Sequence, residues 1–266
     1  MIVSFSSWNG VTHISRIKWV LFRNYFNIFT DEMFYRVISH NFALLLINVL
    51  FIPTIAFLAA LCVEKGMKYK GFFRTALFVP VTLPMLLVAI LFRWVYSIDN
   101  GMINSFLGFL GLDALQTDFL GNTRTALTAV AFMGVWKSMP FHMTIILAGL
   151  QGVPRDLEEA ALIDGCSEVQ SVWHVTIPVL RPVLTVVYGL VVIDAFRVFD
   201  LVFVSTLGGP ANSTAVISTY IYNVAFKDMR LGYSTALSTV NVALVLLISV
   251  IYFHFSMKSN TGSGDR

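Results

Sequence analysis

The sequence predicts an all-α membrane protein, a multi-span bundle with five membrane-crossing helices. Of the 266 residues, 57% are hydrophobic and only 12% are charged, whereas about 25% of the residues of a soluble domain are charged. Five apolar stretches are long enough to cross a bilayer as a helix, which takes about 20 residues. In lipid a helix satisfies its own backbone hydrogen-bonding groups. The predicted spans are Val37–Val63, Phe73–Tyr96, Thr125–Leu150, Leu180–Thr206 and Ser234–Met257.

Prolines interrupt the first two spans. Pro53 lies in the first, and "FVPVTLP" places Pro80 and Pro84 about one helical turn apart in the second. A proline in a helix leaves a backbone carbonyl without its donor and bends the helix. Two interpretations remain open: an ordinary kink that serves helix packing, or a discontinuous helix that lines a transport path.

The orientation in the membrane rests on the loop between the first two spans. The basic residues outside the spans divide almost evenly between the two sides, but the densest cluster lies in Lys65–Arg74. The total count does not decide by the positive-inside rule, and the dense cluster favours placing this loop in the cytoplasm. The polar segment Asp156–Pro182 lies two spans further along, hence on the same side. The long loops Ser97–Arg124 and Leu207–Tyr233 then face outward.

The polar segment between the third and fourth spans predicts two short helices joined by a turn. Pro154 suits the first position of a helix, acidic residues follow it, and Gly165 is a typical stop. Ser167 and Gln170 have the spacing of a capping box, and the second helix should end before Pro178. The first helix is about nine residues long, which is marginal in water, so it needs a surface to dock on. That surface is either the membrane base of the chain itself or a soluble partner.

The same segment resembles the EAA signature of the permease subunits of ATP-binding-cassette importers. "EAALIDGCSEVQSVWHVTIP" (Glu159–Pro178) has the E-A-A, the D-G and the terminal aliphatic-x-aliphatic-Pro of that signature, with valine and isoleucine where isoleucine and leucine are usual. Two stretches resemble the maltose-type sugar-permease branch: "LAGLQGVPRDLEEAALIDG" (Leu147–Gly165) and "FRVFDLVFVSTLGGPANSTAVISTYIYNVAFKDMRLGYSTALS" (Phe196–Ser238). The resemblance extends from about Ser4 to Met257.

This resemblance implies a type I importer permease that moves a sugar or related carbohydrate into a bacterial cell across its inner membrane. The transmembrane domain would cover residues 37–257, with a cytoplasmic coupling loop at about 151–179 and a cytoplasmic tail at 258–266. Family members usually have six spans, and the first would be missing here because the start was placed too far downstream or because the chain is naturally short. Residues 1–36 would then be extracytoplasmic.

The partners implied by the resemblance are an ATPase dimer, a second homologous permease and an extracytoplasmic solute-binding protein. The sequence has no G-x-x-x-x-G-K-[ST] motif, so we expect no catalytic residue and no cofactor in this chain, with ATP and Mg²⁺ bound by the ATPase. The implied contacts with the ATPase are Glu159, Ala160, Ala161, Asp164, Gly165 and Pro178. The implied contacts with the binding protein are Gly208, Gly209 and Pro210.

Charged residues inside the predicted spans offer a candidate transport path. Lys137 and Asp194 lie near mid-span, and Arg197 and Asp200 follow Asp194 at intervals of three, broadly on one side of a helix. Charges at this depth pair with one another or face a cavity. The pairs would be Lys137 with Asp194 or Asp194 with Arg197. The family resemblance also implies that the segments around Arg197 and Ser138 contribute to a sugar site. The residues predicted to line the path are Met85, Lys137, Ser138, Phe141, Asp194, Arg197 and Val198, with Phe141, Tyr188 and Phe196 offering aromatic faces to sugar rings.

Two other classes of function compete with the importer. An ion- or proton-coupled secondary transporter could use the same charges as a relay, but such proteins usually contain repeats, and none is found here. An intramembrane hydrolase would need a nucleophile motif or metal ligands, and the five histidines have no metal-binding spacing. The two cysteines are expected to be reduced and structural. The sugar itself stays open among mono-, di- and oligosaccharides and sugar phosphates.

Overall fold

The computed structural model describes residues 1–13, 17–66 and 69–261. Lys68 of the basic cluster and residues 262–266 of the predicted tail lie outside the described residues. The chain forms two compact units, each assembled from three separate stretches of sequence. Unit 1 comprises Met1–Ile47, Pro84–Gly134 and Ile193–Ile248, and unit 2 comprises Asn48–Leu83, Val135–Val192 and Ser249–Arg266.

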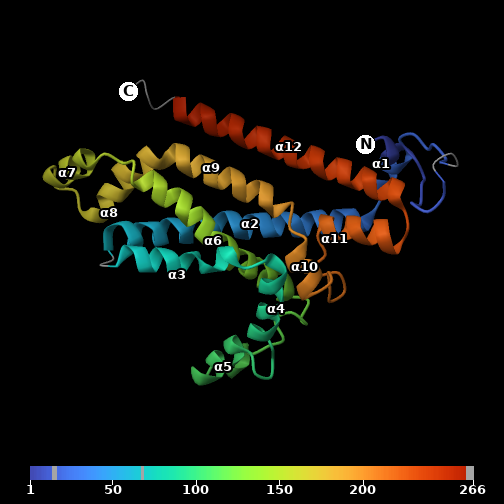
Figure 1. Cartoon of the computed structure of the whole chain (residues 1–266), viewed down its shortest axis with the longest axis horizontal. Coiled ribbons are helices and arrows are strands. Elements are labelled where there is room, and N and C mark those ends of the chain that lie inside the picture. The colour runs from blue at the N-terminus through green and yellow to red at the C-terminus, as the bar shows by residue number, and fades with distance from the viewer. Residues whose placement is uncertain (14–16, 67–68, 262–266) are drawn as a thin grey trace. The chain divides into compact units, whose positions relative to one another are not determined.

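The all-helical prediction is confirmed, because the described residues form helices and one isolated β-bridge between Ser6 and Trp19. Four helical stretches of the described chain are long and apolar enough to cross a membrane, and a bent helix pair makes a fifth if it is counted as one span. These stretches carry the labels of Figure 1. They are α2 (Glu32–Leu61) with the π-helical turn η3 (Cys62–Gly66), the pair α3 (Lys70–Thr82) and α4 (Met85–Val95), α6 (Ala126–Leu150), the run α8 (Glu168–Ser171), η5 (Val172–Thr176) and α9 (Ile177–Ala195), and α12 (Leu231–Thr261).

The second span is interrupted just before Pro84, in the segment where the two prolines predict a kink. Leu83 is extended, with φ −76° and ψ 134°, and separates α3 from α4. A proline disfavours helical backbone in the residue before it, which accounts for the extended Leu83 ahead of Pro84. Pro53 and Pro80, in contrast, are accommodated inside continuous helices. The break frees the carbonyl of Val81, which accepts a 2.8 Å hydrogen bond from Nζ of Lys137.

The predicted bounds of the fourth span, Leu180–Thr206, were wrong at both ends. The helix already begins at Glu168 and runs through Pro178, where the sequence predicts an end. The π-helical turn η5 explains this, since the N–H of Ile177 bonds to the carbonyl of Val172, five residues back. Such a turn re-registers the backbone hydrogen bonds ahead of a residue that has no N–H to donate.

The far end of this helix also differs from the prediction. α9 ends at Ala195, and α10 (Asp200–Ser205) begins after a non-helical Phe199. Asp194, Arg197 and Asp200 therefore do not share a helix face: the first lies in the last turn of α9, the second lies in the connection and the third begins α10. A spacing of three places residues on one side only while the helix continues.

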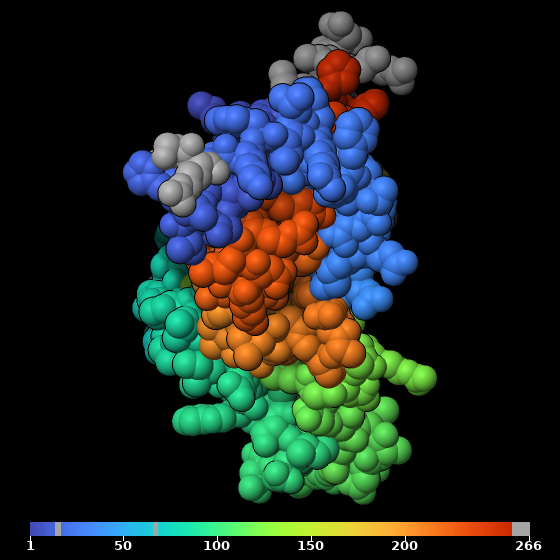
Figure 2. Space-filling model, turned by 90° about the vertical axis from the view of Figure 1, so that its right-hand side faces the viewer, coloured from blue at the N-terminus to red at the C-terminus, as the bar shows by residue number. Residues whose placement is uncertain are grey.

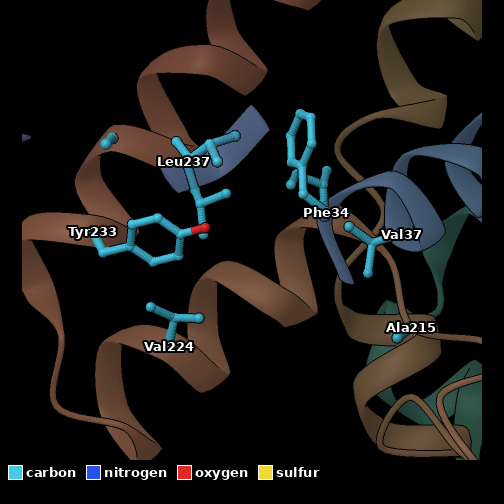
Figure 3. Close-up of a cluster of buried hydrophobic side chains, with 9 residues drawn as sticks. Phe34, Val37, Ala215, Val224, Tyr233 and Leu237 are labelled. Carbon is cyan, nitrogen blue, oxygen red and sulfur yellow. The ribbon is translucent and has the colours of Figure 1, made fainter. Parts of the chain in front are cut away.

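The core of unit 1 lies where α1 (Arg23–Phe29), the first half of α2, α11 (Ile217–Tyr222) with η6 (Asn223–Lys227), and the start of α12 meet. Figure 3 shows its buried side chains, among them Phe34, Val37, Val224 and Leu237. At its edge, Oδ2 of Asp31 accepts hydrogen bonds from the hydroxyls of Tyr220 and Tyr233.

The N-terminal segment packs on the start of α12. The N–H of Gly232 donates to the carbonyl of Trp8 at 2.9 Å, and Nδ2 of Asn24 donates to the carbonyls of Ser4 and Ser6 at 2.7 and 2.8 Å. The same contact is visible in Figure 2, where the dark blue segment lies against the orange residues. Two further helices of unit 1, α5 (Met102–Phe109) and the 3₁₀ turn η4 (Asp113–Leu115), lie in the long loop after α4.

The core of unit 2 joins the second half of α2 to α6 and α9. Ala56, Ala60 and Val63 pack there against Met143, Ile146, Leu147, Leu180 and Val187. Close helix packing depends on Gly149 in α6, where a Cβ atom would lie 2.9 Å from side-chain atoms of Leu180 and Val183. The end of α12 is tied to α9 by Tyr252, whose hydroxyl donates to the carbonyl of Thr185 at 2.9 Å.

Candidate coupling loop and transport path

The coupling loop of unit 2 has the helix–turn–helix form that the sequence predicts. α7 (Arg155–Ile163) begins one residue later than expected, with Pro154 as its N-cap. It ends where Gly165 adopts φ +90°, with the N–H of Gly165 bonded to the carbonyl of Leu162 and that of Cys166 to the carbonyl of Ala161. This pair of bonds is a Schellman motif, which favours glycine because a side chain is strained at positive φ.

The predicted capping box at the start of α8 is confirmed. Oε1 of Gln170 accepts from the N–H of Ser167 at 2.8 Å, and Oγ of Ser167 accepts from the N–H of Gln170 at 3.4 Å. The box satisfies two backbone donors that a helix start otherwise leaves unpaired. The turn between α7 and α8 is thus fixed by local hydrogen bonds on both sides of Cys166.

The outer surface of α7 is unusually apolar for a short helix in a polar loop. Leu157, Leu162 and Ile163 are 46%, 48% and 86% exposed. Four of the residues implied at the ATPase contact, Glu159, Ala160, Asp164 and Gly165, are also exposed. The other two differ, since Ala161 is buried and Pro178 is half-buried in α9.

Glu158, which the sequence reasoning did not select, joins α7 to the rest of unit 2. Its Oε1 accepts from Nζ of Lys65 at 2.8 Å and from Oγ1 of Thr176 at 2.8 Å. Burial alone would raise the pKa of Glu158, but these two hydrogen bonds and the charges of Lys65 and Arg155 lower the pKa below its ordinary value. Lys65 is 93 positions away in the sequence, so no local pattern could reveal the pair.

A hollow of about 480 Å³ lies beside this contact, lined among others by Lys65, Glu158, Glu159 and Ser171. Oγ of Ser171 is buried without a hydrogen-bond partner. A second ion pair, between Lys70 and Glu64 at 3.5 Å, borders the hollow. Charged and polar side chains thus gather around Glu158, beside the apolar Leu150, Val153 and Leu162 of the same lining.

The residues predicted to line the transport path are divided between the two units. Unit 2 holds Lys137, bonded to the carbonyl of Val81, together with Ser138 and the exposed Phe141. Unit 1 holds Met85 at the start of α4, the exposed Asp194 and Arg197, and the partly exposed Val198. Their common lining of one path stays a prediction.

In unit 1, Asn41 holds both ends of the connection that follows α9. This fully buried residue of α2 donates from Nδ2 to the carbonyl of Ala195 and accepts at Oδ1 from the N–H of Ile217, both at 2.9 Å. Nδ1 of the neighbouring His40 lies 2.8 Å from the carbonyl of Ala215. Sequence reasoning missed Asn41, although an amide within an apolar span is itself a signal of interhelical hydrogen bonding.

Phe196 does not offer a face to a sugar, contrary to the prediction. It is fully buried, and its ring meets Phe42 edge-on at 5.5 Å between centroids. Just after the end of α9, its side chain is directed against Phe42 of α2 instead of toward solvent.

The glycine-glycine-proline loop predicted to meet a binding protein is closed by threonines. Oγ1 of Thr214 lies 2.7 Å from Oγ1 of Thr206 and donates to the carbonyl of Gly209 at 2.8 Å. Gly208 is buried at φ +89°, whereas Gly209 and Pro210, joined by a cis peptide bond, are partly exposed. The role of Gly208 is thus to shape the loop, and its neighbours form the accessible part.

Beside the loop is an open hollow of about 410 Å³, to which Arg93, Asp118, Thr206 and Pro210 contribute.

Comparison with known proteins identifies the family. Residues 52–258 match the model of the "Binding-protein-dependent transport system inner membrane component" family. The multiple sugar-binding transport system permease protein MsmF of Streptococcus mutans is 31% identical over 96% of this chain and 86% of its own length. The trehalose/maltose transport system permease protein MalF of Thermococcus litoralis is 33% identical over 91% of this chain and 81% of its own.

The fold has a close match among solved structures as well. A chain of a bacterial ABC transporter that imports the acidic polysaccharide alginate superposes with a TM-score of 0.82 at 25% identity, covering 90% of this chain and 84% of that one. An amino acid ABC transporter matches with a TM-score of 0.56 at 17% identity, a likeness of fold alone. The chain therefore belongs to the binding-protein-dependent transport inner membrane components, the permease subunits of ABC importers, and to their maltose-type branch.

Proposed function

We propose that this chain is the permease subunit of an importer that carries a sugar or related carbohydrate through a bacterial inner membrane. Relatives whose names specify multiple sugars or trehalose and maltose, similar over most of both chains, support this substrate class. The chain works with a second, homologous permease and with a solute-binding protein that delivers the sugar on the outer side. Gly209 and Pro210 form the accessible part of that docking loop, shaped by Gly208.

The observation that carries the proposed energy coupling is the exposed apolar surface of α7. Burying a leucine or isoleucine side chain contributes about 1.5–3 kcal/mol, and Leu157, Leu162 and Ile163 all remain accessible on this nine-residue helix. A separate ATPase dimer, which binds ATP and Mg²⁺, receives this helix. The residues that contact the ATPase directly are Glu159, Ala160, Asp164 and Gly165. Ala161 and Pro178 are less accessible and help to hold the loop in place.

ATP-driven closure of the ATPase then moves the coupling loop and opens the path to the other side. The residues proposed to line this path are Met85, Lys137, Ser138, Phe141, Asp194, Arg197 and Val198. Hydroxyl-rich solutes suit a lining of this kind because its charged and polar groups offer hydrogen bonds in place of water.

The test substitutes two exposed apolar residues, one at a time, in the full complex, which is purified together with its ATPase. Ile163→Ser should lower the amount of ATPase that copurifies and abolish ATP-dependent uptake, because it removes apolar contact from the docking surface. Phe109→Ser in α5 is the control, since Phe109 is 85% exposed against 86% for Ile163. Normal copurification and uptake with Ile163→Ser would contradict the docking role. Uptake that survives ATP depletion but stops with an uncoupler would favour an ion-coupled transporter instead.

A further inference from the structure

We propose that Glu158 is a positioning residue that pins the coupling helix α7 to the ends of two membrane-spanning helices, so that movement of α7 reaches both. The proposal rests on the proposed function, in which an ATPase seats α7. It concerns a residue just before the E-A-A signature, whose carboxylate is held by two other elements of unit 2.

One carboxylate oxygen makes both contacts. Oε1 of Glu158 lies 2.8 Å from Nζ of Lys65, in the turn η3 that ends the first span, and 2.8 Å from Oγ1 of Thr176, in the turn η5 that leads into α9. Thr176 is fully buried, and the side chain of Glu158 is 24% exposed. The next residue along, Glu159, is exposed. Of the two neighbouring glutamates, Glu158 is thus the one that other elements of unit 2 hold.

These are the hydrogen bonds by which α7 side chains reach other elements, as far as the described residues show. The helix is otherwise joined to its neighbours by short turns, and Ala161 is its buried residue. A hydrogen bond to an ionised carboxylate is stronger than one between neutral groups. The lowered pKa of Glu158 keeps the carboxylate ionised at neutral pH.

Both partners of Glu158 lie in π-helical turns, η3 and η5. A π-helical turn interrupts the regular ladder of a helix and is frequent at functional sites. A displacement of α7 therefore acts on the first and fourth spans at the two places where their backbones depart from α-helical geometry. Without Glu158, α7 can still dock on the ATPase, but it then moves with less effect on the spans.

The experiment uses the complete complex in liposomes and measures ATPase copurification and sugar transported per ATP hydrolysed. Glu158→Gln should copurify the ATPase as the wild type does, yet transport per ATP should fall by roughly tenfold, the effect of losing one charge-assisted hydrogen bond. Asp156→Asn is the control, because Asp156 is an exposed acid of the same helix. The exchange Lys65→Glu with Glu158→Lys should recover part of the loss, which general destabilisation would not allow.

The outcomes separate the two proposals. Equal transport per ATP in Glu158→Gln and Asp156→Asn would overturn the positioning role, and so would loss of the ATPase from the Glu158→Gln complex, because Glu158 would then act in docking. Failure of the proposed function would show differently, as a wild-type complex that contains no ATPase.

Discussion

Asn41 and Asn48 provide a test of how much a buried amide contributes to the fold of this protein. Both lie in α2, seven positions apart, and both are buried. Asn41 uses its donor and its acceptor, on the carbonyl of Ala195 and the N–H of Ile217. Oδ1 of Asn48, in contrast, is buried with no hydrogen-bond partner. Replacing each by alanine removes the same atoms from the same helix but different interactions.

The expected difference follows from the bonds lost. Side-chain hydrogen bonds within membrane proteins contribute about 0.6 kcal/mol on average and about 1.7 kcal/mol at most. The two bonds of Asn41 therefore amount to roughly 1–3 kcal/mol, or about a 5- to 150-fold change in the ratio of folded to unfolded protein. The volume lost is the same in Asn48→Ala, so this contribution largely cancels in the comparison. Beyond the effect of the lost volume, Asn48→Ala should lower the free energy of unfolding little, because the oxygen that it removes has no hydrogen-bond partner.

The measurement is thermal unfolding of the detergent-solubilised protein, together with sugar uptake in liposomes. Asn41→Ala should unfold at a lower temperature than Asn48→Ala, and uptake should fall more in Asn41→Ala because the connection carrying Arg197 loses its anchor at both ends. Equal melting temperatures for the two variants, or a lower one for Asn48→Ala, would refute the reasoning.

Three further predictions concern other parts of the molecule. Gly232→Ala should loosen the N-terminal segment, because its Cβ atom would collide with the backbone oxygen of Ser6, and limited trypsin digestion should then cut faster at Lys18 than in the wild type. Burial alone would raise the pKa of Asp31, but hydrogen bonds from two tyrosine hydroxyls and two backbone N–H groups lower the pKa below 3.8. The stability from this carboxylate is therefore present above pH 3.8 and lost as pH falls through the lowered pKa, and melting curves should show a smaller acid loss in Asp31→Asn. Arg197→Ala should change substrate preference or KM more than protein abundance, and a pure loss of folded protein would show that the exposed guanidinium has a structural role instead.

Much of the fold could be predicted because its signals are local. The apolar stretches mark the spans, two prolines mark the break at Leu83, and Ser167 with Gln170 marks the start of α8. Gly165 marks a helix end because only a residue tolerant of positive φ fits the Schellman turn. Each of these features depends on a few neighbouring residues, so the sequence alone predicts it.

The fourth span could not be placed correctly because hydropathy does not report the backbone hydrogen-bond pattern. The π-helical turn η5 lets the helix continue through Pro178, which is usually a sign of its end. At the other end, apolar residues recur on both sides of Ala195, and hydropathy does not report the backbone angle at which the helix stops. A helical-face argument made across that break groups Asp194 with Asp200, which the structure separates.

In the candidate site, too, features with a local sequence signal could be predicted and features that depend on tertiary structure could not. The signature residues of the coupling loop are recognisable as a contiguous motif, whereas the contacts of Glu158 and Asn41 join segments that are far apart in the sequence. Hydrogen bonds of this kind depend on tertiary structure, and a single sequence contains no pattern that pairs their partners.

The threonine-closed loop at Gly208–Thr214 has a consequence for the speed and strength of encounters on that surface. The Thr206 and Thr214 hydroxyls already hold its turn in the isolated chain. The loop therefore loses little conformational entropy when another protein binds to it. We therefore expect rigid-body association at this loop, with an association rate constant that is set by diffusion and orientation instead of by loop ordering.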